Sequence, residues 1–170
     1  LVVSPLIALM QDQLDDLKSR GIHAFSLAGV SSPRDVERIL NNAERRTPCF
    51  LFASPEKLKG KLVQMRVERL GIRTVAIDEA HCISEWGHDF RPAYRQLATL
   101  RIATSEATWC CFTATATERV ISDIHHNLHL KEPSVFRAST RRPNLTYAFC
   151  TVRDSEAMLY QAALNSQGTG

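Results

Sequence analysis

Several protein classes are excluded by what this sequence lacks. No apolar run approaches the roughly 18 residues that a membrane-spanning helix requires, so the sequence offers no membrane partner. None of the five cysteines belongs to a CxxC pair, which argues against a zinc ribbon or a disulfide framework and favours a reducing, intracellular location. A net charge of +3 permits a polyanionic partner but is too small to indicate one by itself.

What the sequence does contain is an alternation of strand and helix patterns. Short apolar runs at 1–3, 23–29, 48–54, 73–77 and 108–114 predict strands, and periodic stretches at 5–20, 33–46, 55–65, 91–103 and 117–130 predict helices. Ser-Pro pairs at Ser4, Ser32 and Ser54 supply an N-cap followed by a proline at the first helical position. Alternation of this kind predicts an α/β fold, with a parallel sheet covered by helices on both faces.

The sequence changes character after Pro133. Residues 134–139 look like a strand, "TRRPNLTY" at 140–147 is typical of a linker, and residues 144–152 begin a further strand. We therefore predict a domain boundary near Arg141 to Pro143, dividing the chain into 1–140 and 141–170. The first residues "LVVSP" lack an initiator Met and look like a strand already under way, so we expect sequence to be missing at both ends.

Two adjacent carboxylates, Asp78 and Glu79, follow the apolar run at 73–77. At the carboxyl end of a buried parallel strand, one acid is well placed to hold Mg²⁺ and its neighbour to activate a water molecule. Phosphoryl transfer to water requires both a bound Mg²⁺ and an activated water molecule. The alternative is that "DEA" merely opens a helix, where the helix dipole favours acidic residues in the first turn.

The acids begin the string "DEAHCISEWGHDFRPAY", which resembles the RecQ family of DNA helicases. Other strings follow in the order of that family's motifs: "VVSPLIALMQDQ", "ASPEKL", "AIDEAH", "FTATAT" and "RRPNLTY". The resemblance covers residues 1–150 and implies a RecA-like P-loop NTPase helicase domain at 1–140, truncated at its N-terminus. Residues 141–170 would then be the linker and the start of a second motor domain. It further implies ATP-dependent 3′–5′ unwinding of single-stranded and forked DNA in recombination, repair and replication.

The resemblance also assigns roles to single residues. Asp78 would coordinate the Mg²⁺ of Mg-ATP, Glu79 would be the general base, and His81 would link the nucleotide site to the DNA site. Thr113, Ala114 and Thr115 would contact His81 and couple hydrolysis to movement. Without the resemblance, "TATAT" would simply be a threonine-rich N-cap between a strand and a helix.

Residues 84–94 resemble the aromatic-rich loop with which the family senses single-stranded DNA. Trp86 and Phe90 offer faces for base stacking, His88 and Arg91 can meet phosphate, and binding of this kind tolerates any sequence. By the same resemblance, Ser4 and Ser54 would contact the DNA backbone, which is compatible with N-capping. The alternative for the loop is that one aromatic ring anchors it to the core, Trp86 before Phe90.

The resemblance has limits. The sequence has no GxxxxGK[ST] loop to cradle ATP phosphates, so we predict that the isolated chain is inactive and that the complete protein is the enzyme. Two other functions stay open: a DEAH-type RNA helicase, and a non-enzymatic remnant that only binds nucleic acid. Protein partners are not indicated, and the compartment would be the nucleus in a eukaryote or the nucleoid in a bacterium. His125, His126 and His129 are interpreted as a solvated helix face rather than a metal site.

Overall fold

The computed structural model describes residues 1–46, 48–139, 142–145, 151 and 155–165. The chain divides into two compact units, Leu1–Pro133 and Ser134–Gly170. The first unit holds the sheet described below, and the second holds helix α8, Ser155–Asn165. No helix within the described ranges is both long and apolar enough to cross a membrane. The boundary that we predict between residues 140 and 141 stays a prediction.

A five-stranded sheet forms the centre of the first unit. The strands are β1 Val2–Val3, β2 Ala24–Ser26, β3 Phe50–Ala53, β4 Thr74–Ile77 and β5 Thr108–Cys111. They lie in the order β2-β3-β1-β4-β5, and every pairing is parallel. The α/β prediction is therefore confirmed. Because β1 lies between β3 and β4, the carboxyl ends of these three strands are neighbours.

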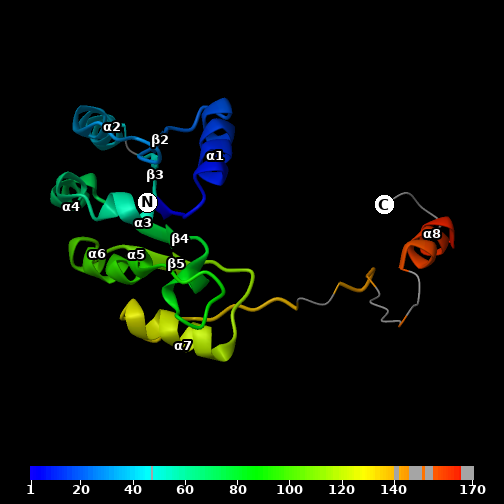
Figure 1. Ribbon diagram of the computed structural model, residues 1–170. Helices are drawn as coiled ribbons and strands as arrows, with labels where there is room; N and C mark the ends of the chain where they lie inside the picture. Colours follow the sequence, from blue (N-terminus) through cyan, green and yellow to red (C-terminus); the bar gives the residue numbers. More distant parts are fainter. Residues whose placement is uncertain (47, 140–141, 146–150, 152–154, 166–170) are drawn as a thin grey trace. The chain divides into compact units, whose positions relative to one another are not determined.

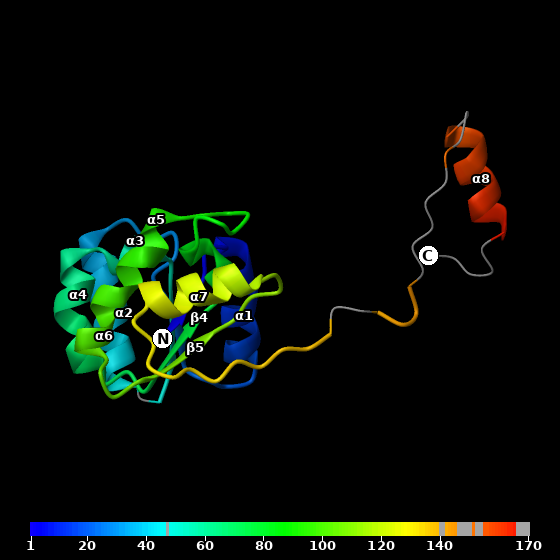
Figure 2. The same ribbon diagram turned by 90° about the horizontal axis from the view of Figure 1, so that it is seen from below.

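Helices cover both faces of this sheet. Figures 1 and 2 show α1 on one face and α2, α4 and α6 on the other. The α-helices of this unit are α1 Ile7–Ser19, α2 Pro33–Arg45, α3 Pro55–Leu58, α4 Lys61–Val67, α5 Pro92–Arg95, α6 Leu100–Ala103 and α7 Glu118–Asn127. Short 3₁₀ turns occur at η1 Glu68–Leu70, η2 Ala80–Ile83 and η3 Gln96–Thr99.

Alternation along β3 explains why the sheet needs helices on both faces. Leu51 and Ala53 belong to the larger core cluster, which also contains apolar residues of α2, α4 and α7. Phe52, between them, packs instead with Met10 and Leu14 of α1. A strand with apolar side chains on both faces is stable only when both are covered, which accounts for the continuous apolar run in the sequence.

Two of the three predicted Ser-Pro caps are confirmed. Ser32 and Ser54 accept hydrogen bonds from the backbone N–H groups of Asp35 and Lys57, both at 3.4 Å, and their prolines begin α2 and α3. The predicted cap at Ser4 is wrong, because α1 begins at Ile7 and Leu6 occupies the N-cap position. The Ser4 hydroxyl accepts from the Leu6 backbone N–H at 3.4 Å, before the helix begins, and donates to the Asp78 carboxylate.

Three further element predictions are wrong. Residues 55–65 form two helices, α3 and α4, with Gly60 between them as the N-cap of α4. Residues 91–103 do not form one helix; they form α5, η3 and α6 in succession, and Thr99 bonds its hydroxyl back to the Gln96 carbonyl at 2.7 Å within the tight middle turn. Residues 134–139 form no strand, since a strand needs a paired neighbour and Phe136 is 92% exposed. The strand expected at 144–152 falls largely outside the described residues.

Candidate functional site

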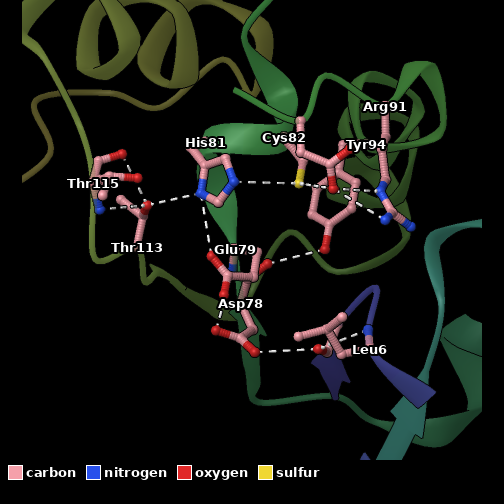
Figure 3. Close-up of polar contacts among 11 residues, drawn as sticks. Leu6, Asp78, Glu79, His81, Cys82, Arg91, Tyr94, Thr113 and Thr115 are labelled. Atoms are coloured by element: carbon pink, nitrogen blue, oxygen red, sulfur yellow. Dashed lines mark hydrogen bonds and ion pairs between the residues drawn. The ribbon is translucent and has the colours of Figure 1, made fainter. Parts of the chain in front are cut away.

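Asp78 lies at the centre of the site, directly after β4. Its backbone N–H donates to the Val3 carbonyl at 2.8 Å, which extends the pairing of β1 with β4. Its carboxylate accepts two hydrogen bonds, from the Ser4 hydroxyl at 3.1 Å and from the Glu79 backbone N–H at 3.0 Å (Figure 3). Ser4 is buried, so its hydroxyl serves this carboxylate. The result is a fixed cluster of hard oxygen atoms at the carboxyl ends of β1 and β4.

Tyr94 holds the backbone of Asp78 from the other side. Its hydroxyl donates to the Asp78 carbonyl oxygen at 3.0 Å, and its ring is completely buried (Figure 3). Burial raises the pKa of this phenol far above its usual value, so it remains a donor at any physiological pH. We did not predict this role from the sequence, where Tyr94 is only the last aromatic of the loop segment.

Glu79 has an unusual backbone conformation. Its φ of 48° and ψ of 44° lie in the left-handed region, which costs a non-glycine residue about 1–2 kcal/mol. Strain of this kind persists only where the surroundings impose it, and it is frequent at functional sites. Here the conformation ends β4 and starts the η2 turn, and it leaves the carboxylate 3.2 Å from Nδ1 of His81. The helix that follows "DE" is a 3₁₀ turn of four residues, 80–83, with Glu79 at its N-cap position.

His81 connects Glu79 to the end of β5. Its Nδ1 lies 3.0 Å from the Thr113 hydroxyl as well as 3.2 Å from Glu79, and the imidazole is almost fully buried (Figure 3). Burial lowers the pKa of His81, with a further lowering from His88 and an opposing effect of Glu79. The ring is therefore neutral at pH 7. Its Nε2 lies 3.8 Å from the Cys82 thiol, a contact in which Nε2 can accept, and this favours the tautomer with hydrogen on Nδ1.

The threonine motif lies on the far side of His81. Thr113 receives its contact from His81 and also accepts from the Thr115 backbone N–H at 3.3 Å, so the hydroxyl organises its own turn. Ala114 is exposed and contributes only a methyl group. Thr117 then caps α7, with its hydroxyl accepting from Val120 N–H at 3.3 Å. The predicted contact between His81 and the motif is thus present at Thr113.

The aromatic loop folds back over His81. The ring of His88 stacks on that of His81 with 4.0 Å between centroids, so a loop residue touches the imidazole that contacts Glu79. Gly87 permits this approach, because a Cβ at that position would lie 2.2 Å from the His81 carbonyl oxygen. Arg91 forms an ion pair with Asp89 at 3.0 Å, and its backbone N–H bonds to the Cys82 carbonyl at 2.9 Å.

The two aromatic side chains of the loop differ in exposure from our expectation. Trp86 is 60% exposed, so the interpretation that it anchors the loop before Phe90 does is wrong. Phe90 is half-buried, with the Arg95 guanidinium 4.9 Å from its ring centroid. Arg95 in turn bonds to Glu85 at 2.8 Å, which ties both ends of the loop together. Trp86 is the more exposed of the two, and the Arg119 guanidinium lies 3.3 Å from its ring centroid.

Ser4 and Ser54, the predicted backbone contacts, follow β1 and β3 at the same edge of the sheet as Asp78. Ser54 is half-buried and caps α3. Asp78 and Ser4 supply carboxylate and hydroxyl oxygens, the ligand type that Mg²⁺ prefers, so these residues fit the predicted ion. Within the described part of the chain, no cluster of three or more His, Cys, Asp or Glu side chains forms a separate metal site.

Comparison with known proteins supports the resemblance found in the sequence. The family model described as DEAD/DEAH box helicase matches residues 1–124. The chain is 41% identical to the ATP-dependent DNA helicase RecQ of Pasteurella multocida over 86% of its own length and 23% of that protein. It is 40% identical to the ATP-dependent helicase wrn-1 of Caenorhabditis elegans over 91% of its length and 15% of that protein.

A third relative extends over the whole chain. The probable ATP-dependent DNA helicase RecS of Bacillus subtilis is 36% identical over 100% of this chain and 35% of that protein. The chain therefore spans about a third or less of the length of these relatives. The family model, the order of the motifs and the parallel sheet agree: the chain belongs to the DEAD/DEAH box helicases and is similar to RecQ helicases among them.

Proposed function

We propose that the complete protein is an ATP-dependent DNA helicase of the RecQ type. In this proposal, residues 1–140 are the greater part of its first motor domain and residues 141–170 lead into the second. The relatives quoted above carry the name ATP-dependent helicase, which supports the same assignment here. Its substrates would be single-stranded and forked DNA, unwound 3′–5′ in recombination, repair and replication.

The observation that carries the proposal is the position of His81. One imidazole contacts the proposed base, Glu79, at 3.2 Å and the threonine motif at 3.0 Å, while His88 of the aromatic loop stacks on it at 4.0 Å. A helicase must make hydrolysis depend on bound DNA, and a buried side chain touching all three parts is suited to that task. A site built only for nucleotide binding would not need the third contact.

In the hydrolytic step, the residues of this chain divide the work. Bound Mg²⁺ would neutralise phosphate charge and polarise the γ-phosphate of ATP. Asp78 would hold that ion, since its carboxylate is already oriented by Ser4 and by the Glu79 N–H. Glu79 would accept a proton from the attacking water, and a positioned general base of this kind contributes roughly 10²–10⁴-fold. When His81 donates a hydrogen bond to the Glu79 carboxylate, the base would be occupied, and when that hydrogen bond breaks, the base would be free to accept the proton.

The DNA side of the proposal depends on the exposed loop. Trp86 is 60% exposed and presents an aromatic ring on which a base can stack, and stacking contributes about 1–3 kcal/mol per base without regard to sequence. His88 and Arg91 lie in the same loop for phosphate contact, although Arg91 must share its charge with Asp89. Ser54 would meet the backbone at the N-terminus of α3. Phe90, which is half-buried and contacts Arg95, would hold the loop in place rather than stack on DNA.

The test compares nucleic acids on the complete protein. We expect ATP hydrolysis to rise strongly with single-stranded DNA and much less with RNA of the same sequence, and we expect forked DNA to be unwound. Stimulation by RNA alone would favour a DEAH-type RNA helicase. Absence of any ATP hydrolysis would favour a protein that only binds nucleic acid.

A matched pair of variants assigns the base. Glu79→Gln removes the proposed base, whereas Glu106→Gln makes the same change at an exposed residue that precedes β5, at the opposite end of the parallel strands. Turnover should fall only for Glu79→Gln, and ATP binding should survive in both. Equal turnover in the two variants would show that Glu79 is not the base.

A further inference from the structure

Helix α7 contacts the aromatic loop at two points that do not involve His81. The Ser84 side chain is completely buried, and its hydroxyl donates to the Asp123 carboxylate at 2.6 Å. The same hydroxyl accepts from the Trp86 backbone N–H at 3.1 Å, so this one side chain fixes the start of the loop. A short hydrogen bond between a buried hydroxyl and a half-buried carboxylate is a strong contact.

The second contact is of a different kind. The Arg119 guanidinium, in the first turn of α7, lies 3.3 Å from the centroid of the Trp86 ring. Both residues are exposed, so water surrounds the pair and the contact is exchangeable. A nucleotide base that stacks on this face of Trp86 has to take the place that Arg119 occupies.

Helix α7 also begins where the threonine motif ends. Thr113 contacts His81, Thr117 caps the helix, and Arg119 follows in its first turn. The inner side of the helix, with Val120 and Ile124, packs in the same core cluster as Ile83 of η2. A shift at the start of α7 is therefore transmitted to Thr113 over a few residues of backbone.

The Nδ1 hydrogen of His81 is the group on which such a shift would act. Two acceptors lie within reach of it, the Glu79 carboxylate at 3.2 Å and the Thr113 hydroxyl at 3.0 Å. One N–H group cannot serve both fully. When Thr113 takes a larger share, the Glu79 carboxylate is released from the imidazole.

We propose that Arg119 is a positioning residue: resting on Trp86 it holds α7 and Thr113 in the DNA-free arrangement, and a base stacked on Trp86 replaces it. Asp123 keeps the helix attached to the loop during the exchange. The inference rests on the proposed function, because it assumes that Glu79 is the base and that DNA stacks on Trp86. It adds a second route from DNA to the base, through α7 rather than through the stacked His88.

The experiment uses the complete protein and four forms: wild type, Arg119→Ala, Arg119→Lys and Arg101→Ala. Arg101 is the matched control, since its guanidinium lies 5.2 Å from the ring centroid of the other tryptophan, Trp109, outside the loop. ATP hydrolysis is measured with and without single-stranded oligodeoxythymidylate, and thermal melting verifies folding. Trp86 fluorescence is recorded in a Trp109→Phe background, with acrylamide as quencher.

Arg119→Ala should raise the rate of ATP hydrolysis without DNA several-fold, and should lower the ratio of the DNA-stimulated rate to that rate by the same factor. Before DNA is added, acrylamide should quench Trp86 fluorescence more strongly in this variant than in wild type. Arg119→Lys, which keeps a cation over the ring, should return both rates toward wild type. Arg101→Ala should change neither. A change that only reduces the folded fraction lowers the measured rate. A folded Arg119→Ala variant with an unchanged or lower DNA-free rate therefore overturns the inference.

Different results would exclude the proposed function and the role of Arg119. If wild type shows no ATP hydrolysis, the proposed function falls and the inference falls with it. If oligodeoxythymidylate stimulates hydrolysis but leaves Trp86 fluorescence unchanged, DNA does not stack on Trp86 and the inference falls while the proposed function stands. If wild type shows DNA-stimulated hydrolysis and Trp86 quenching while Arg119→Ala behaves like wild type, the inference alone falls.

Discussion

Replacing Gly87 with alanine tests whether the aromatic loop has to lie against His81. A Cβ atom at residue 87 would lie 2.2 Å from the His81 carbonyl oxygen and 3.1 Å from the Ser84 carbonyl oxygen. Real Cβ atoms essentially never come closer than 3.0 Å to another heavy atom. The backbone at residue 87 therefore has to move at least 0.8 Å away from the His81 carbonyl oxygen, the difference between 3.0 and 2.2 Å. The obstacle is backbone and cannot rotate away.

The loss of stability depends on whether the loop can move outward. Overpacking typically destabilises a protein by about 1–3 kcal/mol, and an exposed loop that can move outward belongs near the lower end of this range. For a chain of this size, 1 kcal/mol corresponds to about 2–4 °C in melting temperature. The same movement separates His88, the next residue, from the His81 ring on which it stacks at 4.0 Å. The functional effect should therefore exceed the loss of stability.

Two measurements separate these effects. Chemical denaturation of Gly87→Ala should show a loss of about 1–2 kcal/mol. In the complete protein, DNA-stimulated ATP hydrolysis should fall about tenfold or more, equivalent to at least 1.4 kcal/mol of coupling, while DNA-free hydrolysis changes much less. Gly60→Ala is the control, because its Cβ would lie 3.1 Å from the Lys57 carbonyl oxygen, a milder conflict away from the loop. A Gly87→Ala protein with wild-type stability and full stimulation would refute the reasoning.

Four further outcomes are expected. Glu79→Gln should lower turnover of the complete protein by about two to four orders of magnitude while nucleotide binding, measured by titration, persists. Burial lowers the pKa of His81 below its usual 6.5, so its contribution to stability is fully present above pH 6.5 and is lost as pH falls through the lowered value. Denaturation of wild type and His81→Gln at several pH values should show this loss only in wild type. Burial raises the pKa of the Cys82 thiol to about 11 from 9.0, so alkylation of the native chain at pH 8 should be about a hundredfold slower there than at an ordinary thiol, as mass spectrometry can follow. Tyr94→Phe leaves the Asp78 carbonyl without its donor, and melting experiments should show a loss of about 1–2 kcal/mol.

Local patterns in the sequence account for most of the fold. The apolar runs predict all five strands, and Ser32 and Ser54 mark the starts of α2 and α3, because capping involves residues only a few positions apart. The position of Asp78 and Glu79 after β4 follows from the same logic, since parallel strands end at one edge of the sheet. Ser4 fails for the opposite reason: its partner, Asp78, is 74 residues away, and no local rule indicates that pairing.

The site shows the same limit. The exposure of Trp86 and the burial of Tyr94 depend on which elements pack over the loop, and the sequence does not state this. Asp123 is 39 residues from Ser84, in a helix whose pattern indicates only an amphipathic surface. The contact between His81 and Thr113 is present in the structure, but it was expected from family resemblance, because nothing in the spacing of the two residues predicts it.

The segment from Asp78 to Tyr94 owes its unusual composition to the way it folds back on itself. Glu79 turns the chain sharply at φ 48°, and Gly87 brings the loop close enough for His88 to stack on His81. Tyr94, the last residue of the segment, returns to bond the carbonyl of the first, 16 positions earlier. Later residues of the string therefore rest on earlier ones. Direct contacts within one contiguous segment therefore link the loop to the two carboxylates: His88 stacks on His81, which lies beside Glu79, and Tyr94 bonds to Asp78.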